Sequence, residues 1–147
     1  EAQPGLVEQG VPAPEATALL RAAGGRPTDA LRLARGGLTA QSWSRLPQAI
    51  RRGEVAALSE RSPAQAIDVL QKLCHDLLAV GAGAQPRFFE PADLPVPPPV
   101  RNLSTWSRSL ANAAKTAEHP FNAGLMLEAL VSEARVHLNS AGKPPRP

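Results

Sequence analysis

The sequence is poor in cysteine and in aromatic side chains. Cys74 is the one cysteine among 147 residues, which excludes an internal disulfide and a zinc site built from several thiolates. Tyrosine is absent, and Phe and Trp together make up 3% of the chain. Strands favour aromatic and β-branched residues, whereas the apolar residues here are mostly Ala, Leu and Val. The composition therefore favours an all-α fold.

Long apolar runs are also lacking. No run approaches the roughly 18 apolar residues of a transmembrane helix, and no basic-then-apolar leader opens the sequence. We therefore expect no contact with a membrane and, with the lone cysteine, a cytoplasmic location. Because the chain begins with Glu1 and not with Met, we also expect it to be a piece of a longer protein.

Motifs that carry chemistry are missing as well. The sequence has no G-x-x-x-x-G-K-[ST] or G-x-G-x-x-G phosphate motif, no H-E-x-x-H pair and no G-x-S-x-G elbow. Cys74 and His75 are neighbours on an expected helix, where adjacent side chains point about 100° apart and cannot share a metal ion well. We expect His75 and Asp76 to face solvent or make local contacts, and His119 and His137 to be structural. We expect no catalytic residue, cofactor or metal in this chain, and a small helical enzyme has almost no support.

What the sequence does contain is a series of helix signals. In the first third, residues 14–23 and 27–35 each begin with a proline in the first turn and end at a glycine pair. Residues 39–52 form the next expected helix, with Thr39 as N-cap. Pro47 lies inside this segment and is expected to break or kink it.

The clearest helix signal spans residues 63–80. Ser62 and Gln65 form an S-x-x-Q capping box around Pro63 at the first helical position. An apolar stripe then recurs every three or four residues, comprising Ile67, Leu70, Cys74, Leu77 and Leu78.

Six prolines in residues 84–101 exclude a helix or a central strand there. We expect an extended connector that Phe88 and Phe89 pin to the helices. Helices are expected again at 103–118 and 123–139, followed by a basic tail. The sequence thus predicts six or seven helices and no strand.

Three blocks, in this order, resemble a known family. The block LLRAAGGRPTDALRLARGG (residues 19–37) has the pattern of the helical lid that follows the ATPase core of AAA+ clamp loaders. The blocks AIDVLQKLCHDLLAVGAGAQPRFF (66–89) and HPFNAGLMLEALVSEARVHL (119–138) resemble the C-terminal region of the delta-prime subunits of bacterial DNA polymerase III.

The resemblance implies a domain organisation and a set of partners. Residues 1–37 would be the remainder of an AAA+ lid, and residues 38–147 a helical collar domain, a bundle of about five helices that holds a ring of subunits together. The partners would be the gamma or tau and delta subunits, with primed DNA and the sliding β-clamp met only through the full complex. ATP-hydrolysing relatives carry an arginine in the lid motif G-S-x-R-D-A-L, and Thr28 stands in its place here. The resemblance thus implies a non-catalytic subunit of a DNA polymerase III holoenzyme.

We therefore expect an assembly module that works through helix packing between subunits. The candidate contacts are exposed parts of the last two helices, around Trp106, Arg108, Met126 and Arg135. The alternative is a small helical nucleic-acid-binding domain, because the net charge is +3 and Arg supplies 13 of the 16 basic residues. Salt-dependent binding to DNA would distinguish the two.

Overall fold

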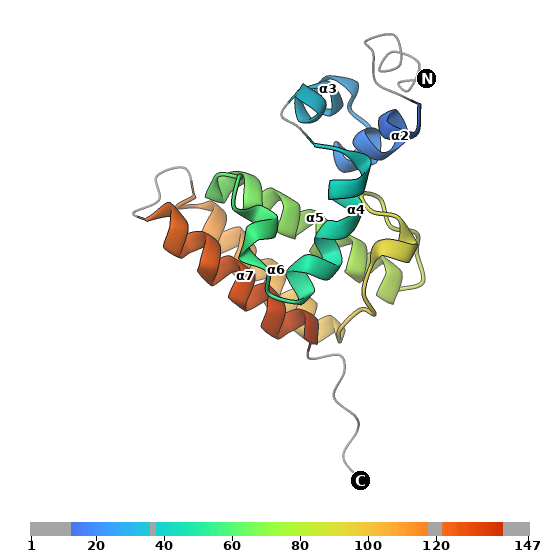
Figure 1. The fold of residues 1–147 in the computed structure, drawn as a ribbon. Helices are drawn as coiled ribbons and strands as arrows, with labels where there is room; N and C mark the ends of the chain where they lie inside the picture. Colours follow the sequence, from blue (N-terminus) through green and yellow to red (C-terminus); the bar gives the residue numbers. More distant parts are fainter. Residues whose placement is uncertain (1–12, 36–37, 118–121, 140–147) are drawn as a thin grey trace.

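The computed structural model describes residues 13–35, 38–117 and 122–139, and all regular structure within these ranges is helical (Figure 1). The expected all-α class is confirmed. In chain order the elements are α2 (Ala13–Ala22), α3 (Pro27–Arg35), α4 (Ala40–Arg51), the 3-10 helix η1 (Val55–Leu58), α5 (Pro63–Gly81), the 3-10 helix η2 (Pro91–Asp93), α6 (Val100–Ala114) and α7 (Ala123–Asn139). In the described ranges after residue 37, four α-helices and two 3-10 helices stand where about five helices were expected.

Side-chain caps fix where two of the helices begin. The Ser62 side chain accepts a hydrogen bond from the Gln65 backbone, and the Gln65 side chain accepts one from the Ser62 backbone. This reciprocal pair is the expected capping box, and it satisfies donors that the first turn of α5 would leave unpaired. Thr39 caps α4 in the same way, with Ser42 as its partner.

Pro47 was expected to break or kink the helix; α4 continues through it, so the break is wrong. Pro47 is itself buried, and Trp43 and Ile50 bury their side chains on either side of it. Proline costs a helix interior roughly 3 kcal/mol. Burial of the apolar face along the whole of α4 offsets that cost.

The main core lies between α4, α5, α6 and α7. The largest fully buried side chain is Trp106 of α6, and Phe89 of the proline-rich segment is also fully buried. In the expected stripe of α5, Ile67, Leu70, Cys74 and Leu77 are buried and Leu78 is half-buried. The stripe packs mainly against α6. None of the helices in the described ranges has the length and apolar character needed to cross a bilayer.

A second, smaller core joins α2 to α3, which pack together at the N-terminal end of α4 (Figure 1). It consists of Ala16, Leu19, Ala23 and Ala30. Leu33 and Leu38 contact both cores, close to the domain boundary expected after residue 37, which stays a prediction. The backbone N–H of Ala40 donates to Glu15 at 2.8 Å and so ties α2 to the start of α4.

The segment between α5 and α6 is not purely extended. It contains η2, and α6 begins at Val100, three residues before the expected start. Burial of Phe89 confirms that this residue pins the segment to the helices. His119, which was expected to be structural, and the basic tail lie outside the described residues.

Candidate functional site

Four residues were predicted to be exposed contacts, and one of them, Trp106, is buried. Its side chain is 0% exposed and stacks against the His137 ring, with centroids 6.2 Å apart. Trp106 lies on the same face of α6 as Leu103 and Leu110, and that face points into the core. A side chain without exposed area cannot contact a partner. The prediction that Trp106 is a contact residue is therefore wrong, and Trp106 belongs to the core.

The other three candidates lie at or near the surface. Arg108 is exposed on α6, and Arg135 is exposed on α7. The Arg135 side chain passes over Gly53, where an added Cβ would meet the Arg135 Cδ atom at 2.7 Å. Met126 is half-buried and packs against the main core.

The outward side of α7 carries an uncovered apolar strip. Leu125 is 63% exposed and Val136 is 68% exposed. They are eleven residues apart, so they share one face of the helix, with the small residues Ala129 and Ser132 exposed between them. We call these four residues the α7 stripe. It points away from the buried residues of α7, which are Leu127, Leu130, Val131, Ala134 and Leu138.

Charges of both signs flank the α7 stripe. Glu128 and Arg135 are both exposed along one edge of it. An apolar strip bordered by charged groups is typical of a surface that another protein covers. Because its apolar residues are exposed and a negative and a positive side chain lie beside them, the α7 stripe is the candidate assembly surface.

A different set of contacts holds the proline-rich segment and sets the position of α2 and α3. The carboxylate of Asp76 is fully buried and accepts the backbone N–H groups of Arg87, Phe88 and Phe89 at 2.9, 2.9 and 2.7 Å. His75 Nδ1 lies 3.1 Å from Asp76 Oδ1. Of the two alternatives expected for Asp76, the local contact is present, with His75, but exposure to solvent is wrong. Three backbone donors satisfy the carboxylate inside the protein.

Two arginines then bind this segment to the helical pair. Arg21 of α2 donates to the Phe89 carbonyl at 2.6 Å and forms an ion pair with Glu90. Arg87 donates to the Gly24 carbonyl at 2.9 Å, at the end of α2. The orientation of α2 and α3 relative to the four-helix core therefore depends on residues that the sequence patterns did not identify.

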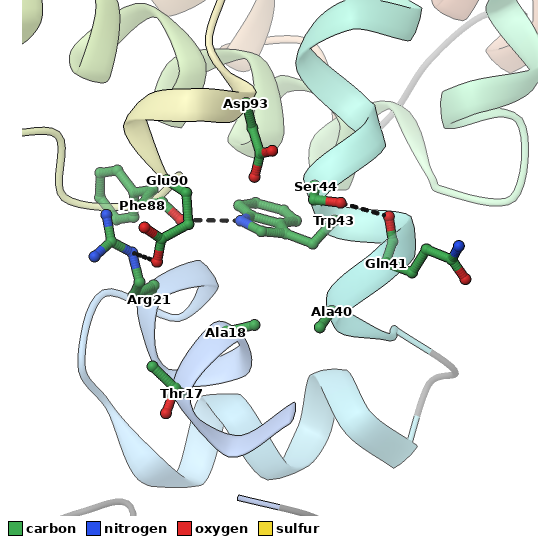
Figure 2. Close-up of a pocket in the computed structure, with 10 residues that line it drawn as sticks. All are labelled: Thr17, Ala18, Arg21, Ala40, Gln41, Trp43, Ser44, Phe88, Glu90 and Asp93. Carbon is green, nitrogen blue, oxygen red and sulfur yellow. Dashed lines mark hydrogen bonds and ion pairs between the residues drawn. The ribbon is translucent and has the colours of Figure 1, made fainter. Parts of the chain in front are cut away.

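Trp43 forms the base of this junction. Its ring stacks on Phe89 with centroids 4.4 Å apart, and its indole N–H donates to the Phe88 carbonyl at 2.9 Å. A cavity of about 370 Å³ lies above it, between α2, the start of α4 and η2. Figure 2 shows the Asp93 carboxylate directed into this space, beside the Arg21–Glu90 pair. Burial raises the pKa of Asp93, the charge of Glu90 raises it further, and Arg21 opposes both.

Elsewhere, the side chains that could react or bind a metal ion are held in packing and hydrogen bonds. Burial raises the pKa of the Cys74 thiol to about 11, and its Sγ atom donates to the Leu103 carbonyl at 3.4 Å. Across the part of the chain that the structure describes, no cluster of three or more His, Cys, Asp or Glu side chains could hold a metal ion. At the start of α3, Thr28 is exposed and Arg26 forms an ion pair with Asp29 at 3.1 Å.

Comparison with known proteins gives no relative for this chain: no family model, no curated protein and no solved structure matches it.

Proposed function

We propose that this chain is a subunit-assembly module of a bacterial clamp loader, formed by the lid remnant and the collar of a delta-prime subunit of DNA polymerase III. The observation that carries the proposal is the uncovered apolar α7 stripe, with Leu125 and Val136 more than half exposed. Burial of such side chains contributes roughly 25 cal/mol per Å² of apolar area. The helix is therefore suited to packing against a helix of a neighbouring subunit.

The resemblance of the sequence supplies the identity of the partners. They are the collar domains of the gamma or tau and delta subunits, and the assembled ring loads the sliding β-clamp onto primed DNA in the cytoplasm. Thr28 supports a role without nucleotide sensing, because its short hydroxyl side chain offers no guanidinium fork to a γ-phosphate. Hydrolysis then belongs to the neighbouring subunits.

The packing of α2 and α3 against the rest of the chain fits this role. Arg21 and Arg87 tie the helical pair to the proline-rich segment, and Asp76 ties that segment to α5, in each case through hydrogen bonds to backbone groups. A lid held in this way would transmit the position of an upstream ATPase core to the collar. The connection is polar and directional, so it sets an angle as well as a distance.

The test is complex formation by the purified chain with collar domains of the gamma or tau and delta subunits, followed by size-exclusion chromatography at tens of micromolar. A co-eluting complex of defined stoichiometry supports the proposal. Separate elution of all components at that concentration would count against it, because an interface of standard size buries about 1,600 Å² and survives this dilution.

A further inference from the structure

Helix α6 carries positive charge and no negative charge on its outward side. Arg101, Arg108 and Lys115 are spaced seven residues apart, and the segment from Val100 to Lys115 contains neither Asp nor Glu. Lys115 is the C-cap and keeps right-handed helical geometry, with φ −65° and ψ −26°. Seven residues at about 100° each fall about 20° short of two full turns. The three cations therefore form one continuous row, which we call the α6 row.

The α6 row lies directly opposite the core. On the helical wheel, Arg108 points about 180° away from the mean direction of Leu103, Trp106 and Leu110. All three cations are exposed. The residues that accompany the row on this face are small or polar, and comprise Ser104, Thr105, Ala111 and Asn112.

The charges of the α6 row are uncompensated among the described residues. Every ion pair in the described ranges lies on another helix or loop, and none involves Arg101, Arg108 or Lys115. On the neighbouring helix α7, the Glu133 carboxylate accepts the Ser109 hydroxyl at 2.6 Å. The N-terminus of α6 adds to the positive charge near Arg101, because its N-cap, Pro99, provides no side-chain cap.

The chemistry of this face differs from that of the α7 stripe. The α7 stripe presents large apolar side chains, which suit a protein partner. Between Arg101 and Lys115, the outward side of α6 presents Arg, Lys, Ser, Thr and Asn with no large apolar side chain exposed. Those are the residue types that contact the phosphates of nucleic acids.

We propose that the outward face of α6 binds the phosphate backbone of a nucleic acid without reading its sequence. The row spans about 21 Å at 1.5 Å per residue, the length of about six base pairs of duplex DNA. Three cations in a line match a regularly charged polyanion. The proposal goes beyond the assembly role and does not depend on it, because the α6 row and the α7 stripe lie on different helices and share no residue.

The test is fluorescence anisotropy of a labelled 20-base-pair duplex titrated with the full 147-residue chain at several salt concentrations. Three neutralised phosphates predict that log K falls with log salt with a slope of about −2.7. In the triple variant Arg101→Gln, Arg108→Gln and Lys115→Gln, we expect at least about a tenfold loss of affinity at low salt and a slope near zero.

The matched control removes the same charge from other faces. Arg35→Gln, Arg45→Gln and Arg51→Gln together also take away three exposed cations that form no ion pair within the described ranges. This variant should bind within about threefold of the parent chain, as expected when no phosphate contact is lost. Equal losses in the two triple variants would overturn the proposal, since they would report net charge alone. Absence of DNA binding by the parent chain at low salt, or binding to an acidic helical peptide in its place, would overturn it as well.

Discussion

The buried carboxylate of Asp76 accepts the backbone N–H of Phe89 at 2.7 Å, across thirteen residues of sequence. This hydrogen bond fixes the chain at the point where Phe89 stacks on Trp43 and where its carbonyl accepts Arg21. A helix side chain thus determines the course of a loop that has little regular structure of its own. Through that loop it also determines where α2 lies.

Replacing Asp76 with Asn should destabilise the protein by about 2–4 kcal/mol. The Asn side chain keeps the shape of Asp but turns an NH₂ group toward backbone donors, which leaves buried N–H groups unsatisfied. Equilibrium unfolding in urea measures the change. The control is Asp68→Asn on the same helix, where the carboxylate is 59% exposed and pairs with Lys72. That substitution should cost less than about 1 kcal/mol, and equal losses in the two variants would contradict a special role for Asp76.

Truncation of Trp106 should affect folding, and truncation of Arg108 should not. Trp106→Ala removes the largest fully buried side chain and should cost about 3–5 kcal/mol in the free energy of unfolding. Arg108 lies two residues further along α6 but faces solvent, so Arg108→Ala should change stability by no more than about 0.5 kcal/mol. Thermal unfolding followed by circular dichroism measures both. A small effect of Trp106→Ala would place this side chain at the surface after all.

The Cys74 thiol should react slowly in the folded protein. Burial raises its pKa from the ordinary 9.0 to about 11, so the reactive thiolate is scarce at pH 8. We expect labelling by a thiol reagent at pH 8 to be much slower for the native chain than for the same chain in guanidinium chloride. Equal rates in the two states would show that the thiol is accessible.

The same shift predicts a loss of stability at high pH. Since the thiol ionises near pH 9 when unfolded and near pH 11 when folded, the unfolded state loses its proton first. The contribution of this group is constant below pH 9 and declines between about pH 9 and 11. Cys74→Ala should remove this part of the decline in urea unfolding series, and an identical pH profile in the variant would contradict it.

At Gly53 the side chain of Arg135 occupies the space that a Cβ atom would take. Its φ is +80°, and an added Cβ would lie 2.7 Å from the Cδ of Arg135. Gly53→Ala should therefore cost more than Gly25→Ala, where φ is +87° but nothing lies within 4 Å. Backbone strain alone costs on the order of 1 kcal/mol in both. Urea unfolding of the two variants gives the difference, and Arg135→Ala should reduce it, since the clash disappears.

The helices could be predicted from the sequence because their signals are local. The capping box at Ser62 and Gln65 and the apolar stripe of α5 depend on residues within a few turns of one another. The predicted break at Pro47 was wrong because burial of the side chains around it outweighs the local cost of proline in a helix. The sequence alone does not show that burial. The burial of Asp76 was not predicted for a similar reason, since its three backbone donors come from a loop eleven to thirteen residues away.

The candidate surfaces could be predicted only in part from the sequence. Trp106 lies on an amphipathic helix, and the pattern alone does not say which apolar residues meet the core and which meet a partner. In α7 the apolar residues surround much of the helix, and the structure separates the buried ones from Leu125 and Val136. Only tertiary packing makes that division. The position of Asp76, three residues after the buried Leu73 on α5, was a signal that could have marked it as core-facing.

The central claim, assembly through α7, is tested most directly by calorimetric titration of two variants against collar domains of the gamma or tau subunit. One variant carries Leu125→Asp and Val136→Asp in the α7 stripe, and the control carries Val96→Asp, an apolar residue that is 77% exposed in the proline-rich segment. We predict that the stripe variant binds at least about 30-fold more weakly, a loss of about 2 kcal/mol, while the control binds as the parent chain does. Unchanged affinity of the stripe variant would contradict the account.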